Sequence, residues 1–447
     1  MRILFLTDDF SGASLCRRLA IEGHEVLAHV RNVAFRQTLD GMVEKIDSMI
    51  AGLEWVGHDG LIVCDDNGFG SLQDQLRGEG YSVVGGSGEG DRLEDDRLYG
   101  QRIFAGHGMM SIPTHVFSTH QEAIHFIEAN PDQWVIKFNG HADKAACYVG
   151  QMLDGSDVID VLQVAHGSRC SESSQSVVLQ KRIHGVEIGC ARYFNGQKWV
   201  GPIEFNIEHK RLFPGDLGPN TCEMGTLMWY DDDEGSRLFQ ETLAKLEPWL
   251  RCHNFRGDID INCIVNEEGA WPLEATTRFG YPAVQAQMSL HKSPWGNFLK
   301  AVADGRDYDL QWQRGYAIVV LVAAPPFPCG VAQAVRPCGA GGGKHDGCGG
   351  ITPRGLRIHF SESLSDEDWR HVHFESVMRD TNDEFRISDD TGYALHVTGN
   401  AETVKNAREE VYRRVGKIVI PRGFYRNDIG LLFEEVQAIL EKQNWIV

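Results

Sequence analysis

The chain has 447 residues, 42% of them hydrophobic and 24% charged, a composition typical of a folded globular protein. At about 150 residues a domain, this length allows about three domains. Lys and Arg number 43 against 63 Asp and Glu, which gives a formal charge of −20. This balance argues against binding of a nucleic-acid duplex, where a basic face supplies most of the affinity. Small anionic ligands are still possible, because a few local cations can outweigh a distant negative field.

No segment predicts a membrane span or a signal peptide. The N-terminal run MRILFLTDDF has four apolar residues followed at once by two aspartates, without a long apolar core or cleavage site. The stretch Tyr316 to Ala324 is too short to cross a bilayer and predicts a buried strand. Eleven scattered cysteines suit a reduced protein. We therefore expect a cytoplasmic protein, a monomer or small homo-oligomer.

The first part of the chain predicts a parallel α/β sheet. RILFLTDD is an apolar run ending in polar residues, residues 11–19 predict a helix, and HEVLAHV predicts a second strand. Further strands are expected within residues 59–66 and 81–86. In such sheets ligands bind at the carboxyl ends of the strands. Residues 1–96 are therefore predicted to form an N-terminal parallel α/β domain.

The middle of the chain changes in character. Residues 92–108 predict one charged helix, and residues 111–140 predict a strand, a helix and a strand. Alternating apolar and polar residues then predict two antiparallel hairpins, at 177–209 with a turn at FNGQ and at 258–280 with a turn at NEEG. We expect an α+β domain over residues 97–312, with a small lid subdomain at about 115–185.

The final third is predicted to be a separate, strand-rich α+β domain over residues 313–447. It contains a glycine-rich loop, GAGGGKHDGCGG, that does not match a phosphate-binding loop, and ends in a predicted helix at 401–418. The fold class is therefore α/β followed by α+β.

A polar segment, FNIEHKRLFPGDLGPNTCEMG (205–225), interrupts the first hairpin region. Its glycines and prolines exclude a core strand. It is either a solvated hairpin tip or a cradle for a charged group.

Five motifs in order resemble one family. EHKR, GDLGPNT and EMG within residues 208–225 are similar to the most recognisable stretch of phosphoribosylamine–glycine ligase, also called glycinamide ribonucleotide synthetase. The resemblance continues in register at VIK (135–137), LQKRIHGVE (179–187), PLEATTRFGYP (272–282) and YRNDIG (425–430). It covers most of the chain and implies an ATP-grasp fold.

The resemblance implies a ligase reaction. ATP-grasp ligases transfer the γ-phosphoryl group of ATP to a carboxylate, and an amine then displaces phosphate to give an amide. Such catalysis depends on positioning and on neutralising anionic oxygens. We therefore expect ATP, Mg²⁺ (or Mn²⁺), an amino-acid carboxylate substrate with glycine favoured, and a small amine.

The resemblance also implies residues for the nucleotide and the metal. Lys137 would reach the phosphates and Glu187 the ribose hydroxyls, although alone Glu187 would be an ordinary hairpin residue. Glu274 is the best metal ligand, with Asn262 across the NEEG turn and Asp260 on the same strand face. The full ATP set is Arg97, Lys137, Lys144, Gln180, Lys181, Ile183 and Glu187.

A second set is implied for the reacting groups. Arg278 would hold the substrate carboxylate as a two-pronged donor, the alternative being a plain ion pair with an acidic neighbour. His209 and Lys210 would lie over anionic groups, and Asp216 and Asn220 would hold the amine or a metal-bound water.

Several loops depart from the family pattern. TDDFSGASL (7–15) and DDNGFGSL (65–72) place Asp8, Asp9, Asp65 and Asp66 where the family holds a phosphate. These carboxylates suit a cationic amine or sugar hydroxyls, unless they only cap the following helix. Arg17 and Arg18 could approach a phosphate if they fold back. On the substrate side, Cys222 and Glu223 replace two glycines, and Thr276 replaces a metal-binding asparagine.

Three functions are therefore open. The first is the glycinamide ribonucleotide reaction. The second is a diverged ligase joining an amino acid to another amine, such as a modified nucleoside or a peptide. The third is a non-catalytic ATP-grasp relative.

Overall fold

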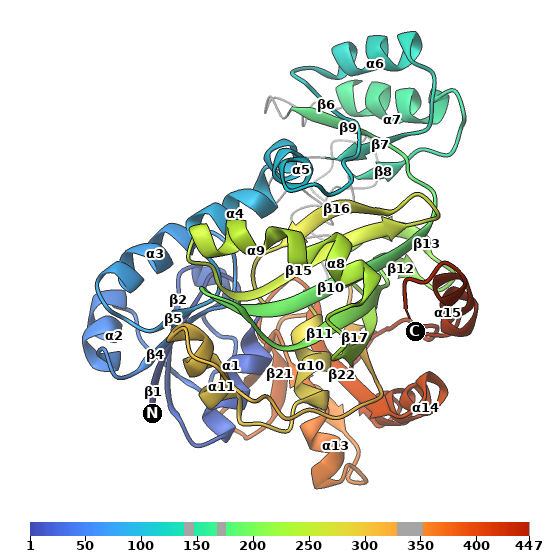
Figure 1. The fold of residues 1–447 in the computed structure, drawn as a ribbon. Helices are drawn as coiled ribbons and strands as arrows, with labels where there is room; N and C mark the ends of the chain where they lie inside the picture. Colours follow the sequence, from blue (N-terminus) through green and yellow to red (C-terminus); the bar gives the residue numbers. More distant parts are fainter. Residues whose placement is uncertain (138–146, 168–175, 329–351, 447) are drawn as a thin grey trace.

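The structure is a computed structural model that describes residues 1–137, 147–167, 176–328 and 352–446. Lys144 and the glycine-rich loop lie outside the described residues. Figure 1 shows a large curved sheet in the middle of the molecule, with the N-terminal sheet against one end and a small α/β unit projecting from the other. Among the described residues, no helix combines the length and apolar character needed to cross a bilayer.

The N-terminal sheet is parallel, in the strand order β3-β2-β1-β4-β5. Opposite faces of β1 and β4 are buried in two separate apolar clusters, because helices cover both sides of the sheet. This confirms the predicted parallel sheet. Its strands are β1 (Arg2–Thr7), β2 (Glu25–Val30), β3 (Glu44–Lys45), β4 (Leu61–Cys64) and β5 (Val83–Val84), and its helices are α1 (Ala13–Ile21), η1 (Val33–Phe35), α2 (Met49–Val56) and α3 (Gly70–Gly78).

The charged segment that follows is two helices, α4 (Gly88–Asp95) and α5 (Arg97–Gly106). Asp96 separates them with an extended backbone, and its carboxylate caps α5 by accepting two backbone N–H groups at 3.0 and 3.1 Å. The prediction of one helix is wrong for this reason. The break makes Arg97 the first residue of α5.

The projecting unit is a four-stranded antiparallel sheet with two helices, which we call the lid. It contains β6 (Thr114–Phe117), α6 (His120–Ala129), β7 (Trp134–Lys137), β8 (Tyr148–Val149), α7 (Ser156–Gly167) and β9 (Val177–Lys181). Its helices pack on the sheet around a separate apolar cluster. β9 therefore belongs to the lid, and the hairpin expected over 177–209 is confirmed only for its second part.

The central sheet has eight strands in the order β16-β15-β10-β11-β14-β17-β22-β19. The β14–β17 and β17–β22 pairs continue the sheet into the final third of the chain. The strands are β10 (Val186–Asn195), β11 (Trp199–Glu208), β14 (Gly225–Asp231), β15 (Arg256–Val265), β16 (Ala270–Thr276), β17 (Tyr316–Ala323), β19 (Val372–Phe374) and β22 (Tyr393–Ala401). The associated helices are α8 (Arg237–Glu241), α9 (Leu243–Cys252), α10 (Ala283–Leu290) and α11 (Trp295–Ala303).

The polar segment 205–225 forms a small hairpin between β11 and β14. Its strands are β12 (Arg211–Phe213) and β13 (Leu217–Asn220). At the tip, Gly215 and Asp216 have φ of 72° and 55°, the left-handed region that a tight turn requires. The tip is exposed, as a solvated hairpin would be.

The remaining C-terminal elements are short strands and three helices around the end of the central sheet. They are β18 (His359–Phe360), α13 (Asp366–Arg370), β20 (Val377–Arg379), β21 (Phe385–Ile387), α14 (Val404–Val415), β23 (Ile418–Val419) and α15 (Phe433–Lys442). The helix predicted at 401–418 is α14, but the chain continues into α15, which the sequence analysis missed.

Candidate active site

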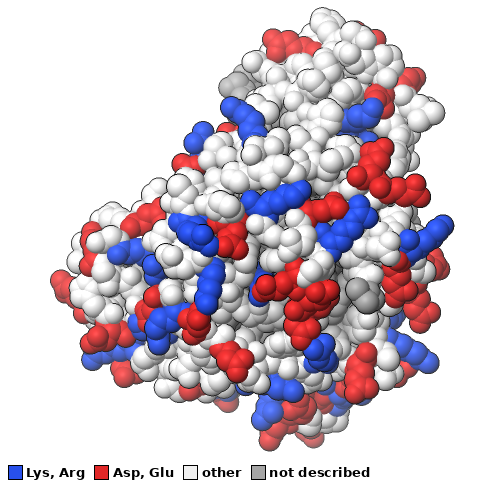
Figure 2. Space-filling model, viewed as in Figure 1, with Lys and Arg blue, Asp and Glu red and all other residues white. Residues whose placement is uncertain are grey.

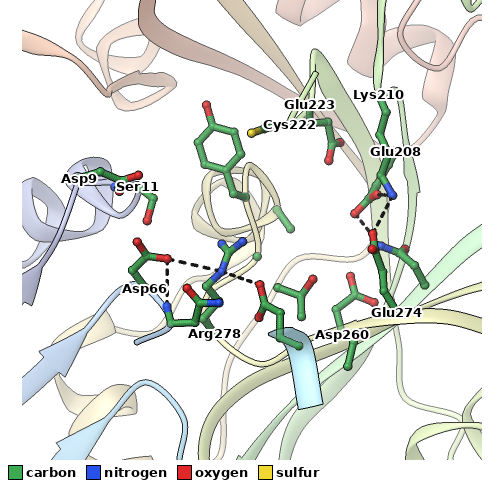
Figure 3. Close-up of a pocket in the computed structure, with 18 of the residues that line it drawn as sticks. Asp9, Ser11, Asp66, Glu208, Lys210, Cys222, Glu223, Asp260, Glu274 and Arg278 are labelled. Carbon is green, nitrogen blue, oxygen red and sulfur yellow. Dashed lines mark hydrogen bonds and ion pairs between the residues drawn. The ribbon is translucent and has the colours of Figure 1, made fainter. Parts of the chain in front are cut away.

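Two cavities meet at the edge of the central sheet formed by β15 and β16. The first, the lid cleft, has a volume of about 330 Å³ and lies between the lid and the sheet. The second, the acidic cavity, has a volume of about 240 Å³ and lies between the N-terminal sheet, the central sheet and the C-terminal segments (Figure 3). Arg97, Lys210 and Glu274 line both.

These three shared residues form a charge network at the junction. An Arg97 nitrogen lies 2.9 Å from a Glu274 oxygen. The Lys210 ammonium lies 2.9 Å from Glu208, 3.2 Å from Glu187 and 3.3 Å from Glu274. Burial alone would lower the pKa of Lys210, but the three carboxylates raise it well above its ordinary value. Lys210 is therefore a permanent cation where the two cavities meet.

The lid cleft contains six of the seven residues that the resemblance assigns to ATP. Lys137 ends β7, and burial together with the charge of Arg97 lowers its pKa to about 8. Gln180 is fixed by donating to the Thr114 hydroxyl at 3.0 Å. The six residues that line the cleft are Arg97, Lys137, Gln180, Lys181, Ile183 and Glu187. The seventh, Lys144, lies outside the described residues.

The two predicted metal ligands are cross-strand neighbours. Asn262 of β15 pairs in register with Glu274 of β16. The Asn262 amide donates to Glu208 at 3.1 Å, and its buried Oδ1 has no hydrogen-bond partner in the described part of the chain. A free buried amide oxygen opposite a carboxylate fits Mg²⁺, which prefers oxygen ligands and completes its shell with phosphate and water.

A complete metal cage is absent from the described residues: no three of their His, Cys, Asp and Glu side chains come together in one. The neighbouring Asp260 is also buried, and burial and the nearby Glu208 raise its pKa to about 8. A metal bound here would therefore depend on the nucleotide for part of its coordination.

Arg278 lies on the floor of the acidic cavity. Its Nε contacts Glu94 at 3.1 Å and Asp66 at 3.7 Å. Both contacts involve Nε, so within the described residues the two terminal nitrogens have no recorded partner, and Figure 3 shows them pointing into the cavity. Burial would lower the pKa of Arg278, but Glu94 and Asp66 raise it above its ordinary value. The ion pair expected as the alternative exists, yet it leaves the fork available.

The acidic cavity has many more carboxylates than cations. Its three cations are Arg97, Lys210 and Arg278, and each of them contacts at least one carboxylate. Burial raises the pKa of Asp66 to about 6, with Arg278 opposing the rise and Asp9 and Glu94 adding to it. The nine carboxylates in the lining are Asp9, Asp66, Glu94, Asp95, Glu208, Glu223, Asp260, Glu274 and Glu375.

Only two of the four aspartates noted at the N-terminal edge line this cavity, namely Asp9 and Asp66. Asp65 is buried and accepts hydrogen bonds from the Thr7 hydroxyl and the Gly12 amide at 3.0 and 2.8 Å, so it supports the loop before α1. Asp8 pairs with Arg31 at 3.0 Å and lies outside both cavities.

Three predicted catalytic residues lie away from the acidic cavity. Asn220 lines the lid cleft. His209 lines neither cavity, and burial and the Arg426 charge lower its pKa. Asp216 also lines neither; its side chain is 70% exposed and pairs with Arg426 at 2.9 Å. The roles of His209 and Asp216 stay predictions, and the structure gives Asp216 a different partner.

The C-terminal part of the chain supplies residues that sequence reasoning missed. Glu375, Ser376, Thr391 and Tyr393 line the acidic cavity together with Tyr281. Nothing in their local sequence indicates a site, because only the long-range packing of β19 and β22 against the other segments brings them there. Cys222 and Glu223 do line the cavity, as expected for the substrate side.

A lid beside an antiparallel sheet, with cations and a carboxylate–amide pair at the junction of two cavities, is the arrangement of an ATP-grasp fold. The model of the phosphoribosylglycinamide synthetase ATP-grasp (A) domain matches residues 95–284. The particular resemblance is to phosphoribosylamine–glycine ligase. The Streptomyces coelicolor enzyme is 24% identical over 451 residues, covering 96% of this chain and 99% of its own. The Halalkalibacterium halodurans enzyme is 24% identical over 365 residues, covering 80% of this chain and 78% of its own.

Solved structures agree on the fold. Phosphoribosylamine–glycine ligase from Thermotoga maritima superposes with a TM-score of 0.68 at 21% identity, covering 96% of this chain and all of its own. The biotin carboxylase domain of Hydrogenobacter thermophilus 2-oxoglutarate carboxylase was solved with MgADP, ADP and bicarbonate. It superposes with a TM-score of 0.63 at 10% identity, covering 99% of this chain and 95% of its own. These matches confirm the ATP-grasp fold and the family resemblance seen in the sequence.

Proposed function

We propose that this protein is an ATP-dependent carboxylate–amine ligase of the glycinamide ribonucleotide synthetase type. The observation that carries the proposal is the junction of the two cavities, where Glu274 faces Asn262 and contacts Arg97 and Lys210. Nucleotide phosphates entering from the lid cleft would meet, at this point, a carboxylate held in the acidic cavity. A non-catalytic relative would not need this connection between the cavities.

The proposal assigns separate residues to ATP, to the metal ion and to the substrate carboxylate. ATP lies in the lid cleft, with Lys137 and Arg97 over the phosphates and Glu187 beside the ribose. Glu274 and Asn262 would hold Mg²⁺ or Mn²⁺, which would supply positive charge beside the phosphate oxygens. Arg278 orients the carboxylate of the amino-acid substrate, glycine being favoured, through its two terminal nitrogens.

The chemistry has two balanced steps. A carboxylate oxygen attacks the γ-phosphorus, and the bond from that phosphorus to the β,γ-bridging oxygen breaks to release ADP. The neutral amine then attacks the acyl carbon of the resulting acyl phosphate, phosphate leaves, and the nitrogen loses a proton. Lys210 stabilises negative charge on the transferred group, because its ammonium lies between both cavities.

The acidic cavity favours a particular kind of amine. The lining has nine carboxyl groups and three cations, and although burial raises the pKa of Asp9, Asp66, Glu223 and Asp260, this excess of acidic groups would disfavour a phosphorylated amine and favour a cationic one. A phosphate oxygen about 5 Å from one carboxylate, at an effective dielectric constant of about 20, meets about 3 kcal/mol of repulsion for each pair of unit charges. We therefore propose, as the finer assignment, an acceptor amine other than phosphoribosylamine, with the glycinamide ribonucleotide reaction as the alternative.

ATP turnover tests the proposal. The protein is assayed with Mg²⁺, glycine and other amino acids, and a panel of amines that includes freshly generated phosphoribosylamine. Release of ADP that depends on both the amino acid and the amine, and that disappears in Glu274→Gln, supports the ligase. ADP binding without turnover for any pair would favour a non-catalytic relative, and efficient formation of glycinamide ribonucleotide would restore the plain family reaction.

The cellular setting is part of the same proposal. Seven cysteines in the described residues are free thiols, which suits a reducing compartment such as the cytoplasm. Figure 2 shows positive and negative side chains interspersed over the viewed face, without a basic patch among the described residues drawn there. We propose a cytoplasmic enzyme that acts on small molecules, as a monomer or small homo-oligomer.

A further inference from the structure

A third cavity is lined by one face of α1, and we call it the arginine cavity. It has a volume of about 150 Å³ and is formed by α1, α10, α13 and β19. It shares no lining residue with the acidic cavity or the lid cleft. Its lining is Ser14, Arg17, Arg18, Ile21, Met288, Trp369, Arg370, Val372, His373 and Phe374.

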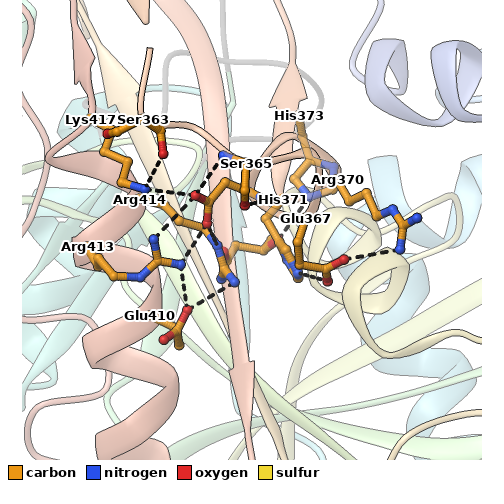
Figure 4. Close-up of polar contacts among 12 residues, drawn as sticks. Ser363, Ser365, Glu367, Arg370, His371, His373, Glu410, Arg413, Arg414 and Lys417 are labelled. Carbon is orange, nitrogen blue, oxygen red and sulfur yellow. Dashed lines mark hydrogen bonds and ion pairs between the residues drawn. The ribbon is translucent and has the colours of Figure 1, made fainter. Parts of the chain in front are cut away.

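The charge in this cavity is positive and only partly compensated. Arg17 and Arg18 have no recorded ion pair or hydrogen bond with any described residue. The Arg17 guanidinium lies 4.8 Å from the centre of the Phe374 ring, a contact that stacks the group but leaves its charge in place. Arg370, in contrast, pairs with Glu367 at 3.1 Å (Figure 4).

The electrostatics agree with this geometry. Burial lowers the pKa of Arg17, and the Arg18 charge lowers it further. Burial also lowers the pKa of Arg18, with Glu22 opposing the change. Glu22 has other partners, since its two oxygens accept the backbone N–H groups of residues 295 and 296 at 3.0 Å each. Both guanidinium groups stay charged at neutral pH.

A buried hydroxyl also faces this cavity without a partner. Ser14 is 5% exposed, and its Oγ makes no hydrogen bond within the described residues. Leaving a buried hydroxyl without a hydrogen bond is unfavourable by about 1–3 kcal/mol. A ligand that accepts a hydrogen bond from Ser14 would therefore be stabilised. His373 is already bound to Thr398 at 3.0 Å, and burial lowers its pKa well below the ordinary value. It therefore adds no charge.

We infer that the arginine cavity binds a phosphate-type dianion, which Arg17 and Arg18 neutralise while Ser14 donates a hydrogen bond. A doubly charged oxyanion matches the two unpaired guanidinium groups, whereas a single carboxylate would leave one of them uncompensated. The ligand is either free inorganic phosphate or the phosphate group of a larger molecule. This inference does not depend on the proposed ligase activity.

The position of the cavity suggests what occupancy would do. The segment Ser11–Ser14 leads from the acidic cavity to the arginine cavity, and so does the segment Phe374–Glu375 on β19 and after it. A bound dianion would hold together two walls of the acidic cavity. Arg17 and Arg18 line this cavity instead of folding back to the N-terminal loop.

Calorimetric titration with inorganic phosphate tests the inference. It is done at neutral pH and constant ionic strength, with saturating MgADP to occupy the lid cleft. We expect one phosphate site, weakened about tenfold or more in Arg17→Gln and in Arg18→Gln and less in Ser14→Ala. Arg36→Gln and Arg314→Gln remove exposed arginines elsewhere and serve as charge-matched controls.

The outcomes separate the possibilities. Unchanged phosphate affinity in both arginine variants, with MgADP binding intact, would overturn the inference, and so would the absence of phosphate binding to the wild type. A parallel titration with ribose 5-phosphate and with ribose identifies the source. If ribose 5-phosphate binds more tightly than inorganic phosphate, and the arginine variants lose this binding, the ligand is a larger phosphorylated molecule. If the two bind equally well, the ligand is free phosphate.

Discussion

At the residue scale, Lys137 is a cation whose charge changes near neutral pH. Its pKa of about 8 results from burial and from the neighbouring Arg97. Nucleotide phosphates pair with the ammonium form only, so ATP affinity should fall as the pH rises through about 8. Lys137→Arg keeps its charge and should lose this pH dependence. ATP titrations on both sides of this pH measure the effect, with Lys198→Arg, which pairs with Asp307 outside both cavities, as control. The same pH dependence in Lys137→Arg would assign the titration to another group.

Arg278 makes a different prediction, because its charge is fixed and its geometry matters. Nε is engaged by Glu94, so only the two terminal nitrogens are available to a carboxylate. Lysine keeps the charge but has no fork. Arg278→Lys should raise the KM of the amino-acid substrate by about tenfold or more and leave that of ATP unchanged. Steady-state kinetics with each substrate varied separately distinguishes the two. A change confined to ATP would move Arg278 into the nucleotide site.

At the element scale, local patterns in the sequence predicted most strands well. The NEEG turn placed Asn262 across from β16, and the β15–β16 pairing sets it opposite Glu274. This pair depends on a register shift between Asn262 and Cys263, because the register nearer the turn would set Asn262 opposite Leu273, and the period-two pattern carries no signal for such a bulge. The sequence placed residues 177–181 both in the first hairpin and in the lid at about 115–185, and the pairing of β9 with β6 and β7 assigns them to the lid. The lining residue Glu375 depends on β19 pairing with β22, a contact without a local signal.

One buried carboxylate links α13 to α14. Asp368 of α13 has a side chain only 3% exposed, and its oxygens lie 2.6, 3.2 and 2.9 Å from Arg413, Arg414 and Lys417. Figure 4 shows these three cations converging from α14 and the residues just after it. The hydrogen bond from Arg413 is the largest cause that holds the pKa of Asp368 well below its usual range.

We expect Asp368→Asn to destabilise the C-terminal part by about 2 kcal/mol, because it removes charged hydrogen bonds to Arg413, Arg414 and Lys417, although both arginines keep Glu410 as a partner. A folded-state pKa below the unfolded one contributes stability above about pH 3.9, and this is lost as the pH falls further. The difference between wild type and variant in thermal unfolding should therefore shrink in acid. Asp366→Asn, exposed in the first turn of α13, is the control. Equal melting temperatures near neutral pH would show that the cluster adds no stability.

At the scale of the whole molecule, the acidic cavity exists only where three distant parts of the chain meet. Asp9 and Asp66 come from the N-terminal sheet edge, Arg278 follows the last strand of the middle segment, and Glu375 follows β19. The matched ATP-grasp domain model, residues 95–284, contributes residues to both cavities. In our proposal the amine binds against the N-terminal loops that depart most from the family pattern, so the acceptor is the substrate most open to change.

The last prediction concerns that acceptor. Asp9 and Glu375 line the acidic cavity from opposite domains, and neither has Arg278 as a recorded hydrogen-bond or ion-pair partner. Replacing both by Asn and Gln should raise the KM of a cationic amine about tenfold or more and weaken its dependence on salt, because two attractive charges are removed. The KM of ATP should not change. Turnover with phosphoribosylamine should increase, since the same charges repel its phosphate.

Asp8→Asn is the matched control, because Asp8 belongs to the same loop but pairs with Arg31 and lies outside the cavity. Initial rates are measured with each amine at two salt concentrations in wild type, double variant and control. If the double variant used a cationic amine as well as the wild type does, the carboxylates would have no part in choosing the acceptor. The excess of negative charge in the cavity would then serve only to hold Arg278, Lys210 and Arg97 in place.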